Sequence, residues 1–109
     1  MAALNQLQQY GISFQIKVLS SLLKHKEFLQ NINDILDTEI FDNPAHKWIV
    51  GEILRYYYKY NTTTSIDALQ VEVRKIENEV LKISVVEQLK EALKSSNEDR
   101  EYIEQEFSS

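Results

Sequence analysis

Tyrosines and cations lie next to one another in residues 55–60, which read RYYYKY. Four of the six tyrosines of the chain fall in this stretch, together with Arg55 and Lys59. Aromatic rings stack on exposed bases and neighbouring cations bind phosphates, so these residue types are typical of proteins that bind single-stranded nucleic acid. The same residues also fit the end of an amphipathic helix that buries some rings and exposes others. The helix that carries the stretch decides between the two interpretations.

Helix signals around residues 42–60 position these tyrosines. Asp42 or Asn43 can cap a helix, and Pro44 suits its first position because the N–H that proline lacks has no partner there. Helical spacing then predicts a shared buried face made of Ala45, Ile49, Ile53, Tyr56 and Tyr60. Tyr58 points elsewhere, so we expect it to be the ring that is free for a partner, and a protein partner fits it better than a base. The interpretation favoured for this stretch is therefore an aromatic seam in a protein core.

Apolar residues at helical spacing continue through most of the chain. They predict helices in residues 13–24, in a short segment ending near Asn33, after a cap at Thr64 or Ser65, and in VLKISVVEQLKEALKSS and REYIEQEF. Two glycines and one proline are too few for the many turns of an all-β protein. We expect an all-α domain, with a globular helical head in residues 1–77 and a two-helix antiparallel hairpin in residues 78–109.

Sequence motifs for catalysis and ion binding are missing from the pattern. The two glycines, Gly11 and Gly51, lie 40 positions apart, so no phosphate-binding loop of the Walker type can form. There is no cysteine, and His25 and His46 lack the neighbouring ligands of a zinc site, so we expect polar surface or helix-end positions for both. The acids near residues 34–42 lack the spacing of a calcium-binding loop. We expect no catalytic residue, no cofactor and no metal.

Charge is distributed unevenly along the chain. The net charge is −5, and residues 72–109 contain ten acidic and six basic residues, which gives −4 for that segment. A domain that binds duplex DNA usually has a positive face, so we do not expect direct nucleic-acid binding. The N-terminal residues MAALNQLQQYGIS do not resemble a signal peptide, and no apolar run approaches the length of a membrane span. Together with the missing cysteines, these features predict a cytoplasmic protein without membrane partners.

The C-terminal segment contains two candidate surfaces for protein partners. Its broad apolar arc consists of Leu81, Val85, Val86, Leu89 and Leu93. A two-helix hairpin cannot cover such a wide arc by itself, so we expect the arc to pair with a second copy of the chain. We expect Glu101 and Glu104, on the last helix, to meet a further, basic partner, and Tyr58, on the earlier helix, to be part of a possible partner surface.

The order of these features over residues 14–107 resembles the N-terminal domain of DnaB-type replicative DNA helicases, in particular the T4-type phage versions. The first helix has the family's V-L-x-x-L pattern at Val18-Leu19-Ser20-Ser21-Leu22, and an acidic and aromatic segment follows at Glu39-Ile40-Phe41. A helix starts near Pro44, and a cap precedes the next helix at Thr64-Ser65-Ile66-Asp67-Ala68-Leu69. Thr64 replaces the proline that is usual in the family, which removes some rigidity from this cap.

The resemblance implies a role in assembly and docking. In that family the domain pairs subunits as a dimer or a dimer-based hexamer, builds a collar above the ATPase ring, and binds primase or the helicase loader. The motor domain that hydrolyses nucleotide is a separate unit, which this chain does not contain. Two alternatives remain open at this point, namely the helicase-binding domain of a primase and a small helical nucleic-acid-binding protein.

Overall fold

Helices make up every regular element in the computed structural model, which describes residues 11–96 and 98–108. In chain order they are α2 (Gly11–Lys24), α3 (Lys26–Ile32), the 3-10 helix η2 (Thr38–Ile40), α4 (Pro44–Tyr60), α5 (Ile66–Arg74), α6 (Glu79–Lys94) and α7 (Arg100–Ser108). The predicted all-α class is confirmed. Residues 1–10 of the predicted head, and residues 97 and 109 of the predicted hairpin, lie outside the described residues.

Both ends of α4 follow from local sequence signals. The Asn43 side chain accepts a hydrogen bond of 2.8 Å from the backbone N–H of Ala45, and Pro44 occupies the first turn. At the other end Asn61 takes the left-handed conformation (φ 58°) and donates its backbone N–H to the Tyr57 carbonyl. Asparagine tolerates this conformation better than most residues, so it ends the helix at little cost. The predicted start and end of this helix are confirmed.

Side-chain caps also begin α5 and α6. Of the two predicted caps for α5, Ser65 is the one that acts, because its hydroxyl accepts a hydrogen bond from the Ala68 N–H at 3.0 Å. The Asn78 side chain accepts a bond of 3.0 Å from the Leu81 N–H at the start of α6. Such caps satisfy N–H groups that have no partner inside the helix. They determine the residues at which α5 and α6 begin.

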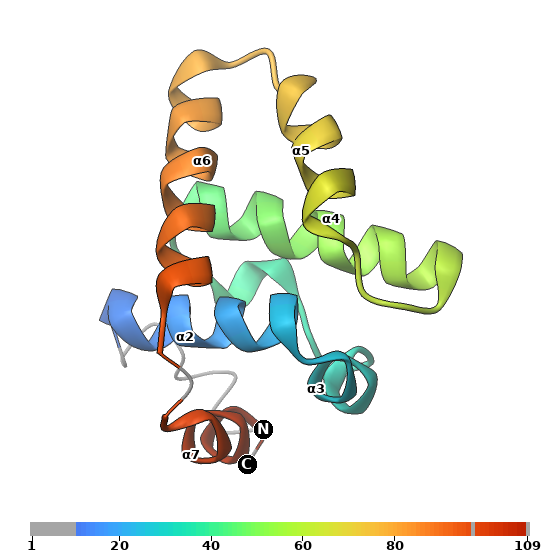
Figure 1. The fold of residues 1–109 in the computed structure, drawn as a ribbon, viewed down its shortest axis with the longest axis vertical. Coiled ribbons are helices and arrows are strands. Elements are labelled where there is room, and N and C mark those ends of the chain that lie inside the picture. The colour runs from blue at the N-terminus through green and yellow to red at the C-terminus, as the bar shows by residue number, and fades with distance from the viewer. Residues whose placement is uncertain (1–10, 97, 109) are drawn as a thin grey trace.

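The core lies where α2, α4 and α6 meet. In Figure 1, α2 and α4 run roughly level and α6 stands across both, with α5 beside it. The fully buried apolar side chains in this region include Val18, Leu19, Leu22, Ile49, Val50, Ile53, Val85 and Ala92. The residues of α6 that lie in the core thus come from its middle and C-terminal half. Among the described helices, none is long and apolar enough to span a membrane.

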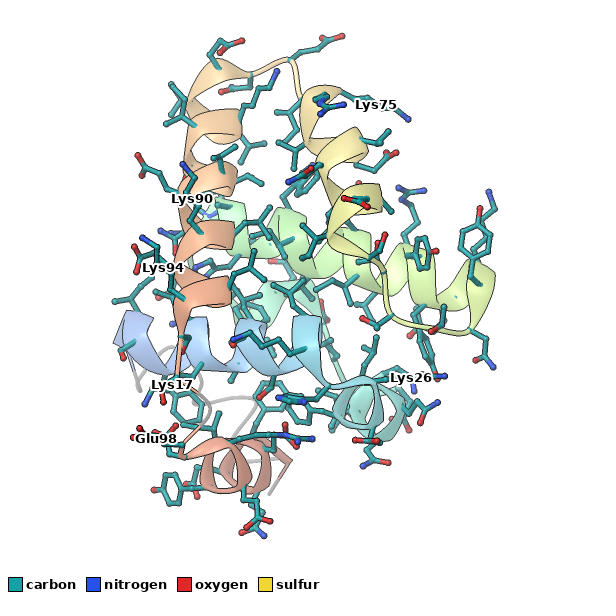
Figure 2. The ribbon with its side chains drawn as sticks, viewed as in Figure 1. Lys17, Lys26, Lys75, Lys90, Lys94 and Glu98 are labelled. Atoms are coloured by element: carbon teal, nitrogen blue, oxygen red, sulfur yellow. The ribbon has the colours of Figure 1, made fainter. Side chains whose placement is uncertain are left out.

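The C-terminal helices correct the predicted hairpin. α6 packs against α2 and α4, whereas α7 packs against α2, so α6 and α7 do not form an antiparallel pair (Figure 1). Phe107 of α7 is fully buried and meets Phe28 edge to face, with ring centroids 5.7 Å apart. Lys17 on α2, labelled in Figure 2, forms an ion pair of 2.5 Å with Asp99, which directly precedes α7. The apolar sides of both helices therefore pack on the core of the head, and not on each other.

Candidate functional site

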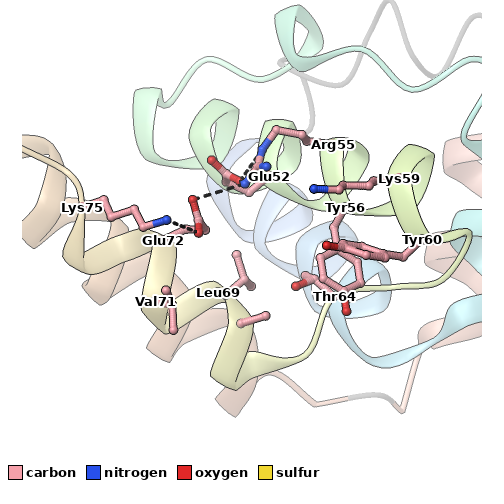
Figure 3. Close-up of a pocket in the computed structure, with 11 residues that line it drawn as sticks. Glu52, Arg55, Tyr56, Lys59, Tyr60, Thr64, Leu69, Val71, Glu72 and Lys75 are labelled. Atoms are coloured by element: carbon pink, nitrogen blue, oxygen red, sulfur yellow. Dashed lines mark hydrogen bonds and ion pairs between the residues drawn. The ribbon is translucent and has the colours of Figure 1, made fainter.

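A groove of about 420 Å³ separates the C-terminal half of α4 from α5, and it contains the tyrosine stretch (Figure 3). We call it the aromatic groove. Tyr56 and Tyr60 lie at one end of it and Leu69 lies deeper, on α5. The cations Arg55, Lys59 and Lys75 belong to its lining as well. This groove has the residue types that the sequence suggested for nucleic-acid binding, so their geometry tests that idea.

The rings of the aromatic groove are only partly buried. Tyr56 is half-buried where burial was predicted, and its ring centroid lies 4.6 Å from that of Tyr60 at a tilt of 46°. Tyr60 is 54% exposed, so its predicted burial is wrong. Ile53 is the last fully buried residue of α4, and in the two turns that follow, Leu54 and Tyr57 are only partly buried against the core. Tyr57 and Tyr58 meet at 70°, so the adjacent rings form no continuous stacking surface.

Two of the cations in the aromatic groove already have carboxylate partners. Arg55 pairs with Glu52 and lies 3.3 Å from Glu72, and Lys75 binds the other oxygen of Glu72 at 3.0 Å. The hydrogen bond with Glu52 raises the pKa of Arg55 above its ordinary value. Lys59 lies over the Tyr60 ring, 5.4 Å from its centroid. An incoming phosphate must therefore compete with carboxylates of the chain itself, which makes this groove a poor anion site.

Tyr58 is the exposed ring that the sequence singled out, with 65% of its surface accessible. Its hydroxyl is engaged, because it donates a hydrogen bond of 2.9 Å to the Asn33 carbonyl at the end of α3. The ring is therefore accessible while its polar end is tied to the fold. Tyr58 acts first as a link between α4 and the end of α3.

The two predicted acidic partner residues lie on α7 and differ in their surroundings. Glu101 is exposed. Glu104 accepts a hydrogen bond of 2.7 Å from the Arg100 guanidinium, and this bond raises the pKa of Arg100. A basic partner would have to compete for Glu104, so Glu101 is the better placed of the two.

The predicted self-association surface on α6 requires a correction. Val85 is fully buried and Leu89 nearly so, since both belong to the core that α6 shares with α2 and α4. Val85 cannot reach a second molecule, and Leu89 exposes only 8% of its surface. Leu81 is half-buried against the same core, whereas Val86 and Leu93 are exposed. Only part of the predicted arc is therefore available to a partner.

Two exposed apolar residues of α6 were not among the predicted interface residues. Val80 is 80% exposed and Ile83 is 57% exposed. They lie three positions apart, on the side of the helix opposite Val85 and Leu89. The sequence signal for them is that apolar residues occur on all sides of this helix, which is more than one core can cover.

His46 lies in the first turn of α4, at a helix end as expected, but it is fully buried and not at the surface. Its Nε2 donates to the Gln88 side-chain oxygen at 2.7 Å and so links α4 to α6. Burial lowers the pKa of His46, and smaller contributions from Gln88 and Asp42 oppose that shift. No group of three or more His, Cys, Asp or Glu side chains within residues 11–96 and 98–108 is arranged to hold a metal ion.

Comparison with known proteins does not place the chain in a family. No family model matches it, and neither a curated protein nor a solved structure matches it. The functional conclusion therefore depends on the surfaces described above and on the order of sequence features.

Proposed function

We propose that this chain is the non-catalytic N-terminal oligomerisation and protein-docking domain of a phage-type replicative DNA helicase of the DnaB class. In this role it forms part of the collar of the hexamer and binds primase or the helicase loader, in the cytoplasm of a bacterial host. The order of the helix caps and apolar positions supports this assignment at the sequence level. At the level of structure, the outer side of α6 supports it best.

That outer side is a rigid and accessible apolar surface. α6 is held in place by the burial of Val85 and Ala92 on its inner side. On the opposite side Val80 and Ile83 expose branched apolar side chains to solvent. Helices in contact bury such residues between them, and a two-fold dimer uses the same surface on both copies. Two exposed apolar residues on one side of a fixed helix are compatible with a protein–protein contact, which would bury them.

Sedimentation equilibrium over a range of concentrations tests this proposal. We expect dimers, or a dimer-based hexamer, that dissociate in Ile83→Asp because the substitution places a charge in the contact. Ile12→Asp is a matched control, since Ile12 lies on α2 and is 52% exposed. Leu89 is unsuitable for this test, because a charge there would disrupt the core. A chain that stays monomeric up to about 1 mM contradicts self-association, because even a weak complex forms at that concentration.

A further inference from the structure

A second groove, of about 390 Å³, lies on the other flank of α5, between α5 and α6. We call it the cationic groove. Its apolar residues are Ile66, Val73, Val86, Leu89 and Leu93. Its cations are Arg74, Lys82 and Lys90. Both helices contribute to each group, so the groove follows the line along which α5 and α6 face each other.

The apolar residues form a floor with raised sides. Val73 and Leu89 are buried and lie at the bottom, whereas Val86 and Leu93 are partly exposed. Val86 and Leu93 are two helical turns apart, which corresponds to about 10 Å along α6. A partner helix presents apolar side chains at this same interval, at positions i, i+3 or i+4, and i+7. The floor therefore matches one face of an amphipathic helix in length and in chemistry.

The cations of this groove form no ion pair with any carboxylate in the part of the chain that the structure describes. None of the ion pairs between described residues involves Arg74, Lys82 or Lys90. Lys82 makes a single long hydrogen bond, of 3.5 Å, to the Arg74 carbonyl. No acidic residue is among the described residues that line the groove. Lys82 and Lys90 also line a neighbouring hollow on α6 together with Glu79 and Glu87, but neither glutamate forms an ion pair with them. A chain with a net charge of −5 thus gathers three positive charges, none of them in an ion pair between described residues, around one apolar floor.

We infer that the cationic groove is the docking site for an acidic amphipathic helix of a partner protein. The inference rests on the proposed function and specifies the chemistry of the partner that this domain would dock. Apolar anchors would enter the floor between Val86 and Leu93, and carboxylates would meet the three cations. Pairing of exposed cations with partner acids speeds association and selects the partner, while the buried anchors supply most of the affinity.

Other occupants fit the cationic groove less well. A second copy that paired groove to groove would bring its own three cations against these three. The acidic helix α7 of a second copy could offer Tyr102, which is 64% exposed, but its aliphatic and phenylalanine side chains Ile103 and Phe107 are buried in its own core. Nucleic acid needs rings on which to stack its bases, and this groove is lined by aliphatic residues.

Fluorescence anisotropy with a labelled synthetic helix tests the inference on the 109-residue chain. The probe is a peptide of about 16 residues, with leucines on one face and glutamates elsewhere, long enough to form four helical turns. We expect micromolar binding that weakens as salt is added. Lys90→Glu and Arg74→Glu should each weaken binding about tenfold, because each replaces an attractive charge by a repulsive one. Leu93→Asp should abolish it.

Matched controls distinguish binding at the groove from non-specific electrostatic or hydrophobic binding elsewhere on the protein. Lys26→Glu makes the same change of charge on α3, at an exposed position that does not line the groove, and should leave binding unchanged (Figure 2). A peptide with lysine in place of glutamate should not bind. Equal binding of both peptides, or full binding by Lys90→Glu, overturns the inference. Binding of labelled oligothymidine at the groove without binding of the acidic helix also overturns it, in favour of nucleic acid.

Failure of this inference and failure of the proposed function give different results. If the acidic helix does not bind but Ile83→Asp still dissociates the chain, the docking site is wrong and the assembly role stands. If the acidic helix binds a chain that remains monomeric, the docking-site inference is supported and the proposed self-association is contradicted.

Discussion

The two flanks of α5 carry grooves of similar size that differ in whether their cations form ion pairs with acidic residues of the chain. The aromatic groove has a volume of about 420 Å³ and the cationic groove about 390 Å³, and three cations line each of them. In the aromatic groove Glu52 and Glu72 compensate two of the cations. In the cationic groove no acid does so. Residue types alone therefore do not identify a site, because what matters is whether the charges are already satisfied within the chain.

The same contrast applies to the apolar residues of the two grooves. The tyrosines of the aromatic groove pack on each other at the projecting end of α4, and Lys59 lies over one ring. The cationic groove instead exposes aliphatic side chains of α6 that have no partner covering them. The tyrosine stretch thus makes its ring and cation contacts within the chain, whereas α6 exposes apolar side chains to solvent.

The largest expected effect comes from truncating Leu69, the buried residue through which α5 packs on the core. Leu69 is almost fully buried, so Leu69→Ala should lower the free energy of unfolding by about 2–5 kcal/mol. Val71→Ala, at an exposed position on the same helix, should change it by less than about 0.5 kcal/mol. Chemical denaturation measures both. Equal effects for the two variants would show that Leu69 does not hold α5, the helix between the two grooves, in its position.

A smaller effect is expected when the aromatic groove is given uncompensated cations. The double variant Glu52→Gln and Glu72→Gln releases Arg55 and Lys75 from their partners. It should bind labelled oligothymidine about tenfold more tightly than the native chain at low salt, and the gain should disappear at high salt. Anisotropy titrations measure this change. An unchanged affinity would contradict the claim that internal pairing keeps this groove inactive toward anions.

The smallest expected effect concerns His46, which links α4 to α6 and so supports one wall of the cationic groove. Because burial lowers its pKa, the unfolded chain takes up a proton more readily than the folded chain. The contribution to stability is complete above the unfolded pKa of about 6.5 and is lost as the pH falls below it. Denaturation midpoints should therefore decline below that pH, and less so in His46→Asn. An identical decline in both proteins would exclude His46 as the cause.

Local signals made most of the helix boundaries predictable from the sequence. Asn43, Pro44 and Ser65 act on N–H groups within a few residues, so their sequence context determines what they do. The burial of Tyr60 was predicted wrongly because helical spacing identifies a face but not how far the core extends along it. Val85 and Leu89 were correctly placed on the apolar arc of α6, but that arc faces the chain's own core.

The candidate site was harder to predict because it depends on contacts between distant residues. Nothing local to Arg74 or Lys90 indicates that both line the same groove, or that no acid lies there. Similarly, the pairing of Arg55 with Glu72 joins α4 to α5 across 17 positions. Tertiary contacts thus decide which charges remain available, and periodicity in the sequence does not record them.

An NMR titration of the ¹⁵N-labelled chain with the acidic helix peptide tests the central claim most directly. It reports the two flanks of α5 in one experiment, residue by residue. We predict that amide shifts concentrate around Val73, Lys90 and Leu93, while the amides of residues 55–60 stay in place. Shifts that concentrate on residues 55–60, or a spectrum that does not change at millimolar peptide, would contradict the claim that uncompensated charge over an open apolar floor defines the site.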